Sequence, residues 1–136
     1  MVTLAIVSFG LLGIAGIVAN SLKSNQTSHV RTQASILAYD IIERMRANRA
    51  TAEQSPSPYN LSLNVAPPNG ETVAENDLLQ WRRAIADALP EGKGSVAIDG
   101  DTQKITVVIR WMQRKLDRGS PATAEEAQQI TIETRL

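Results

Sequence analysis

Histidine and cysteine, the residues that most often hold metals or activate nucleophiles, are nearly absent from this chain. His29 is the only histidine, and the 136 residues include no cysteine. A zinc site needs several nitrogen or sulfur ligands. None of the serines lies in a nucleophile elbow, and the only histidine that could act as a base lies close to the apolar N-terminal segment. The sequence therefore predicts no metal, no cofactor and no catalytic residues, and we expect a protein that is not an enzyme.

The acidic residues Asp99 and Asp101 have the spacing of the first two ligands in a calcium loop. Such a loop continues with further oxygen ligands and closes with a glutamate, and that series does not follow here. Asp99-Gly100 is also a common signal for a hairpin turn. We interpret the pair as part of a turn.

Three arginines, Arg44, Arg46 and Arg49, form a basic cluster that could bind phosphate or acidic lipid. Cations are also favoured at the C-terminal end of a helix, where they offset its dipole. The chain has a net charge of zero and a pI near 6.6, so no overall positive field attracts nucleic acid. The helix-end interpretation is preferred, and no nucleic-acid partner is expected.

The segment 1–22 has no charged side chain, and the first charge is Lys23. An apolar run of more than about 18 residues is typical of a transmembrane helix. A signal peptide would have a basic start and a shorter apolar core, and a buried helix of a soluble protein would have a polar face. We expect residues 1–22 to cross a membrane and to pack through small residues. The side chains expected to contact lipid or other helices are Leu4, Ile6, Val7, Phe9, Gly10, Leu11, Leu12, Gly13, Ile14, Ala15, Gly16, Ile17 and Ala19.

Residues 23–49 are predicted to continue the same helix in an amphipathic form. Neither proline nor glycine occurs between Gly16 and Pro56, so nothing in that interval breaks the helix. Apolar residues recur there at helical spacing. This stripe is expected to pack on the rest of the domain, and it consists of Val30, Ala34, Leu37, Ile41 and Met45.

The remaining residues, 50–136, are predicted to form a small head domain. The proline-rich residues 50–75 indicate a long loop, in which alternating residues 59–65 allow a short strand or an anchored extended segment. A second helix is predicted over 77–89, with Asp77 as its N-cap, Gln80 completing a capping box, and Pro90 as its stop.

After this helix the hydrophobic period changes to two, which predicts an antiparallel sheet of about three strands over 94–136. We expect polar residues 114–127 to form a surface connection, with the last strand beginning at Gln128. A sheet this small needs a helix on its face, so the chain is predicted to be α+β. The expected head core consists of Leu78, Trp81, Ile85, Ile105, Val107, Ile109 and Trp111.

The chain resembles the type IV pilin-like family in the order of these elements: an apolar helix continued as an amphipathic one, a loop, a helix and an antiparallel sheet. Four strings resemble minor pilins of the PilV type, the type IV pilus modification proteins. They are SFGLLGIAG, LAYDIIERMRANRA, DLLQWRRAIADALP and ITVVIRWMQ. The similarity starts within the family's helix, so we expect the basic leader and the first mature residues of the family to be missing before Met1.

The resemblance implies a non-catalytic minor pilin that helps to prime pilus assembly near the tip, supporting twitching motility and adhesion. Implied partners are other minor pilins, the major pilin, the inner-membrane assembly machinery, a tip adhesin and, before assembly, the lipid bilayer. Two alternatives stay open: a minor pseudopilin of type II secretion, and a single-pass membrane protein whose head binds a ligand.

Lys23 and Arg31 follow the span, and positive charge favours the cytoplasmic side of a membrane. The family instead places the C-terminal domain in the periplasm, because its basic leader lies on the cytoplasmic side. We follow the family: a single pass in the inner membrane, a periplasmic head, and later a place in the pilus at the cell surface.

Overall fold

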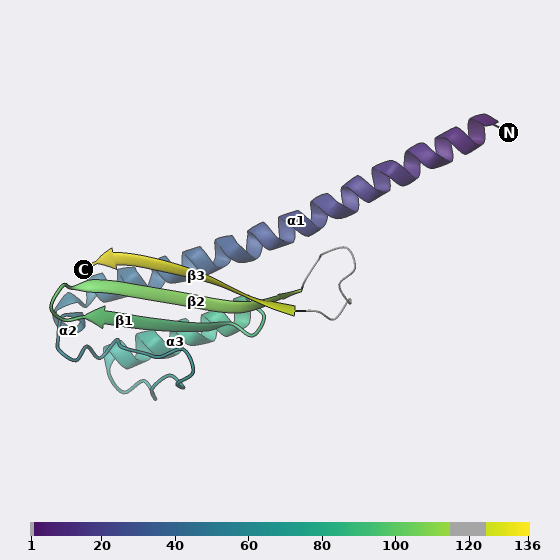
Figure 1. Ribbon diagram of the computed structural model, residues 1–136. Helices are drawn as coiled ribbons and strands as arrows, with labels where there is room; N and C mark the ends of the chain where they lie inside the picture. Colours follow the sequence, from purple (N-terminus) through teal and green to yellow (C-terminus); the bar gives the residue numbers. More distant parts are fainter. Residues whose placement is uncertain (1, 115–124) are drawn as a thin grey trace. The chain divides into compact units, whose positions relative to one another are not determined.

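A computed structural model describes residues 2–114 and 125–136 (Figure 1). The chain consists of two compact units, residues 1–30 and residues 31–136. The elements are α1 (Val2–Ala47), α2 (Arg49–Ala52), α3 (Val73–Ala88), β1 (Lys93–Asp99), β2 (Lys104–Arg114) and β3 (Glu125–Arg135). The second unit combines the C-terminal part of α1 with the other helices and one antiparallel sheet of three strands. The α+β prediction is confirmed.

In the second unit α1 contributes a wider buried face than the sequence indicated. Ala34, Ile41 and Met45 are buried as predicted, and the helix also buries Ala38 and Ile42. Leu37 is half-buried, and Val30, also half-buried, falls within the first unit. The helix ends at Ala47, and the predicted end near Arg49 is replaced by the separate short helix α2.

The predicted start of the second helix at Asp77 is wrong: α3 begins at Val73. Its N-cap is Thr72, whose hydroxyl accepts a hydrogen bond from the Glu75 backbone N–H at 3.2 Å. The Glu75 carboxylate accepts in return from the Thr72 N–H at 3.1 Å. This capping box satisfies two free backbone donors and lies five residues before the one we inferred. Asp77 is thereby placed one turn inside the helix.

The sheet has the strand order β1-β2-β3, with both pairs antiparallel. Val96 pairs with Val107, and Val107 pairs with Ile132 on the other side. The last strand begins at Glu125 and not at Gln128, because Glu125 pairs with Arg114 across the ladder. The part of the predicted connection that covers 115–124 lies outside the described residues.

The core of the head is formed by α1, α3 and one face of the sheet. Each member of the predicted set is at most 3% exposed: Leu78, Trp81, Ile85, Ile105, Val107, Ile109 and Trp111. Tyr59 and Leu61 from the long loop are also buried. The loop therefore contributes to the same core as the helices and the sheet.

The extended segment predicted within the loop is anchored to the outer edge of β1. Leu61 and Val96 exchange backbone hydrogen bonds of 2.9 Å, forming an isolated bridge. The side chain of Asn60 accepts a further bond from the Ile98 N–H at 2.8 Å. The Arg82 guanidinium donates to the carbonyls of Leu63 and Val65 on this segment at 3.1 and 2.7 Å. This edge of the sheet is therefore covered.

Gly94 allows α3 to approach β1 closely, and replacing it with alanine is expected to destabilise the head. A Cβ at this position would lie 2.4 Å from the Trp81 ring and 2.6 Å from Ile85. Overpacking of this kind costs about 1–3 kcal/mol, which chemical denaturation of the full chain in detergent can measure. Gly100→Ala is the matched control, because its Cβ would meet only the Ser55 side chain at 3.1 Å. Equal stability of the two variants would contradict the expected overpacking.

Candidate functional site

α1 presents an exposed apolar surface over Val2–Ala19. Its mean hydropathy is 2.4, none of this window is buried, and it is long and apolar enough to cross a membrane. Phe9 is 77% exposed and Ile17 is 72% exposed. Every residue that the sequence assigned to lipid or helix packing between Leu4 and Ala19 is exposed. No other part of the described chain therefore buries this apolar surface.

Three glycines in this helix, Gly10, Gly13 and Gly16, are spaced three residues apart. A Cβ added at any of them would meet nothing within 4 Å. Each glycine costs a helix about 1 kcal/mol relative to alanine, and no close contact within the described chain requires one. Small residues on a membrane helix let another helix approach closely. Contacts within the described chain therefore do not account for the three glycines.

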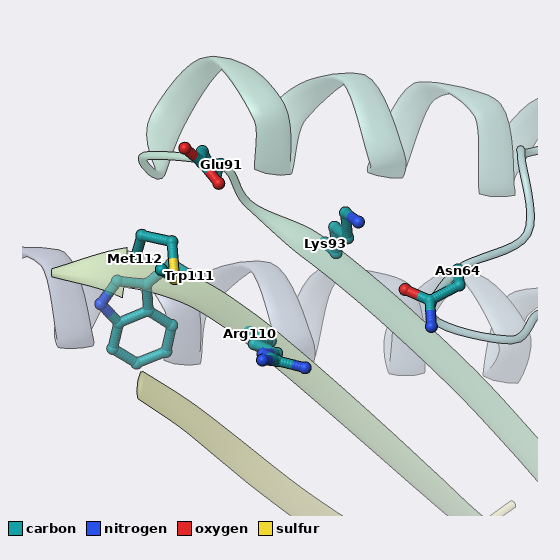
Figure 2. Close-up of a pocket in the computed structure, with 6 residues that line it drawn as sticks. All are labelled: Asn64, Glu91, Lys93, Arg110, Trp111 and Met112. Atoms are coloured by element: carbon teal, nitrogen blue, oxygen red, sulfur yellow. The ribbon is translucent and has the colours of Figure 1, made fainter. Parts of the chain in front are cut away.

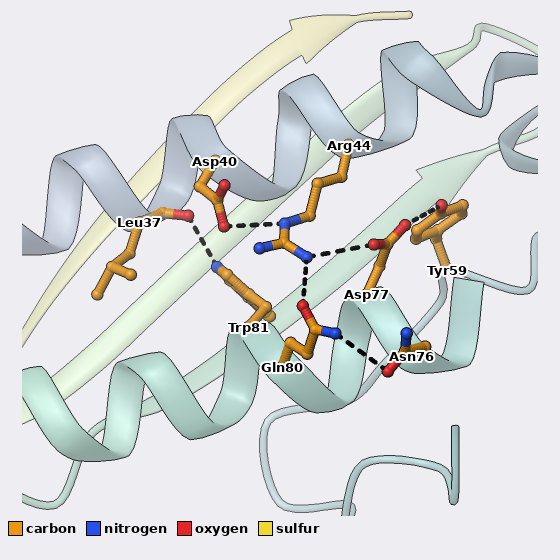
Figure 3. A network of polar contacts seen from close by, with 8 residues as sticks. All are labelled: Leu37, Asp40, Arg44, Tyr59, Asn76, Asp77, Gln80 and Trp81. Carbon is orange, nitrogen blue, oxygen red and sulfur yellow. Dashed lines mark hydrogen bonds and ion pairs between the residues drawn. The ribbon is translucent and has the colours of Figure 1, made fainter. Parts of the chain in front are cut away.

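A polar cluster joins α1, α3 and the long loop inside the second unit (Figure 3). Arg44 donates through Nε to Asp40 at 3.1 Å. Its Nη1 reaches across to α3 and donates to Asp77 at 3.2 Å and to Gln80 at 3.1 Å. One guanidinium thus links carboxylates on two helices. The four-residue spacing of Asp40 and Arg44 is visible in a helical sequence, whereas a partner of Arg44 that lies 33 residues away is not.

Tyr59 extends the cluster to the loop. Its hydroxyl donates to Asp77 Oδ2 at 2.7 Å and accepts from Asn48 Nδ2 at 3.1 Å. Burial, followed by the hydrogen bond to the Asp77 carboxylate, raises the pKa of Tyr59 to about 12. The tyrosine is therefore held as a neutral donor, and the arrangement positions the loop instead of activating a nucleophile.

The raised pKa of Tyr59 predicts a loss of stability in strong alkali. The neutral side chain is favoured in the fold, so its contribution is complete below pH 10, the ordinary tyrosine pKa, and is lost as the pH rises through about 12. We expect the free energy of unfolding to fall between these values. Tyr59→Phe should be less stable at pH 8 and should lack this part of the alkaline loss. An unchanged slope in that variant would show that Tyr59 is not the responsible group.

Trp81 makes the other side-chain link between α3 and α1 in Figure 3. Its indole Nε1 donates to the backbone carbonyl of Leu37 at 2.7 Å. Gly94 lies against the same ring. The apolar spacing of α3 predicted that Trp81 would be buried, but the hydrogen bond could not be inferred because it ends on a backbone atom.

A cavity of about 230 Å³ lies beside β2. It is lined by Asn64, Glu91, Lys93, Arg110, Trp111 and Met112, and Figure 2 shows that their polar ends do not converge on one point. Binding pockets usually combine an apolar lining with a few convergent polar groups. This cavity lacks the second feature.

The described residues include no group of three or more metal-ligating side chains. His29 is exposed. The Asp99 carboxylate accepts from the Asp101 N–H at 3.0 Å and from the Thr102 N–H at 3.5 Å. Hydrogen bonds from Thr102 and Asp101 lower the pKa of Asp99. Asp99 therefore shapes the turn between β1 and β2, as the sequence predicted.

Comparison with family models, with curated proteins and with solved structures finds no match to this chain. What is known of this chain therefore comes from its own sequence and structure. The chain has an N-terminal helix that is long and apolar enough to cross a membrane, and an α+β domain with one small antiparallel sheet.

Proposed function

We propose that this chain is a minor pilin of a type IV pilus: a non-catalytic subunit that first anchors in the inner membrane and then enters the filament. The observation that carries the proposal is the apolar surface of α1 over Val2–Ala19, of which none is buried by the chain itself. An exposed apolar helix of this length needs an apolar environment. Lipid supplies it before assembly, and helices of neighbouring subunits supply it within a filament.

The three glycines of α1 support the state in which this helix packs against helices of neighbouring subunits. A helix that only crossed lipid would gain nothing from three glycines, whereas close packing between helices does. Gly10, Gly13 and Gly16 leave open space on the described chain. That space fits helices of the major pilin or of other minor pilins, and the subunit would help to prime assembly near the tip.

In this proposal the head is periplasmic and recognises neighbouring subunits. Its side-chain network links Asp40 and Arg44 on α1 to Asp77 on α3, and Asp77 in turn accepts from Tyr59 of the loop. This holds the exposed side of the head in one shape, which recognition of another subunit requires. Twitching motility and adhesion would depend on the chain through pilus assembly.

The test is the location of the protein in cells that assemble pili. We expect the full chain in the membrane fraction and also in sheared, purified filaments. Replacing Gly13 and Gly16 together by leucine should leave membrane insertion unchanged and reduce the filament fraction at least several-fold. Replacing Ser8 and Val18 together by leucine is the matched control on the same helix, because both residues are exposed and neither belongs to the set expected to contact lipid or other helices. A protein that never leaves the membrane fraction would overturn the proposal.

A further inference from the structure

The long loop carries three exposed asparagines, Asn60, Asn64 and Asn69. An asparagine side chain can be attacked by the backbone nitrogen of the residue that follows it, so its chemical stability depends on that neighbour. Leucine follows the first of the three and valine follows the second, whereas Asn69 is followed by Gly70. Glycine has no Cβ to obstruct the attack, and it leaves the backbone free to rotate. The sequence of the loop therefore singles out Asn69.

The hydrogen bonds of the loop separate the three asparagines in the same way. After Asn60, the Leu61 N–H donates to the Val96 carbonyl at 2.9 Å. After the second asparagine, the Val65 N–H donates to a carbonyl of the same loop at 3.2 Å. A backbone nitrogen held in such a bond cannot turn toward the preceding side chain. The Gly70 N–H has no hydrogen-bond partner among the described residues.

The backbone around Asn69 is held by few contacts. Residues 66–70 lie outside the helices and strands, and within the described chain no backbone hydrogen bond restrains them. Gly70 has a φ of 84°, a conformation that glycine adopts without steric cost. The attacking nitrogen and the exposed side chain that it would attack are therefore able to meet within the folded head.

We infer that Asn69 is a site of spontaneous modification, at which the side-chain amide is lost and a carboxylate forms. The Gly70 nitrogen bonds to the side-chain carbonyl carbon of Asn69, the amide C–N bond breaks, and the amide nitrogen leaves as ammonia with the proton that Gly70 gives up. The product is a five-membered cyclic imide. Water opens this ring at either carbonyl. One opening gives aspartate, and the other gives isoaspartate, in which the main chain runs through the former side chain.

The modification changes both the charge and the shape of the head. The chain has 14 basic and 14 acidic residues and is formally neutral, so one added carboxylate gives it a net negative charge. Isoaspartate also lengthens the backbone directly before Gly70, where a Cβ would lie 3.2 Å from Leu79 and 3.7 Å from Asn76 of α3. The altered backbone therefore lies against the first half of α3. Copies of the chain that differ in age are expected to differ in charge and in this surface.

The experiment incubates the purified full chain in detergent at neutral and at mildly alkaline pH, and follows each loop asparagine by peptide mass spectrometry. We expect Asn69 to convert at least tenfold faster than Asn64, the exposed control in the same loop, and to yield both aspartate and isoaspartate. The rate should rise with pH, because the attacking nitrogen has to lose its proton. In Asn69→Gln the acidic form should no longer accumulate on ion exchange, because the longer side chain would have to close a less favourable six-membered ring.

Unfolding in urea separates the effect of the structure from that of the sequence. Asn60 should convert faster in urea, because the bond between Leu61 and Val96 is released. Asn69 should change less than threefold, because its surroundings restrain it little in either state. The inference is overturned if Asn69 stays intact, if it converts no faster than Asn64, if urea accelerates it as much as Asn60, or if the acidic form still accumulates in Asn69→Gln.

Discussion

Replacing Trp81 by alanine is expected to destabilise the head more than any other single truncation in its core. The ring is fully buried, lies against Gly94 and donates to the Leu37 carbonyl at 2.7 Å. Truncation of a buried tryptophan costs about 3–5 kcal/mol, and it leaves that part of the α1 backbone without its side-chain donor. Thermal or urea unfolding of the full chain in detergent measures the loss.

A milder pair of substitutions separates the hydrogen bond from the packing. The chain has two tryptophans, both buried, and Trp111 Nε1 has no hydrogen-bond partner among the described residues. Tryptophan to phenylalanine removes an N–H in each case, and an intact bond is worth about 0.5–1.5 kcal/mol net. Trp81→Phe should therefore cost more than Trp111→Phe by roughly this amount, with the remaining tryptophan serving as the fluorescent reporter. Equal losses would show that the bond to Leu37 contributes nothing.

The sequence predicted the elements whose signal is periodic. The charge-free start and the alternation around Val107 identify the apolar helix and the central strand without any tertiary information. The buried residues of the head core also follow from these periods, because one face of each element has to be covered. Helix and strand boundaries were less certain, since Thr72 and Asp77 can both cap a helix. In the structure the box forms between Thr72 and Glu75, although Asp77 and Gln80 have the same spacing.

The contacts that position the loop could not be inferred from the sequence. Arg44 meets Asp77 across 33 residues, and Arg82 binds backbone carbonyls of Leu63 and Val65. Nothing in the spacing of these residues distinguishes them from ordinary charges on a helix surface. The buried face of α1 was underestimated for a related reason: Ala38 and Ile42 extend the buried stripe, and how many neighbours flank a helix is a property of the whole fold.

The largest effect on localisation is expected from two arginines in the middle of the apolar helix. Leu11 and Ile14 are 62% and 60% exposed, so the described chain makes little use of either side chain. An arginine near the centre of a membrane helix costs about 2.5–3.5 kcal/mol for insertion, and roughly twice that for two. The double variant Leu11→Arg, Ile14→Arg should therefore be lost from the carbonate-resistant membrane fraction, whereas Leu11→Met, Ile14→Val should stay there.

The same double variant also separates insertion from folding. Because residues 1–30 form a unit of their own and these side chains are exposed, the unfolding of the head should shift by less than about 0.5 kcal/mol, as for a surface substitution. The change in fractionation then reports the cost of charge in lipid and not a misfolded protein. A double variant that remains carbonate-resistant with a folded head would show that this helix is not held by the bilayer, and the pilin proposal would lose its membrane-anchored stage.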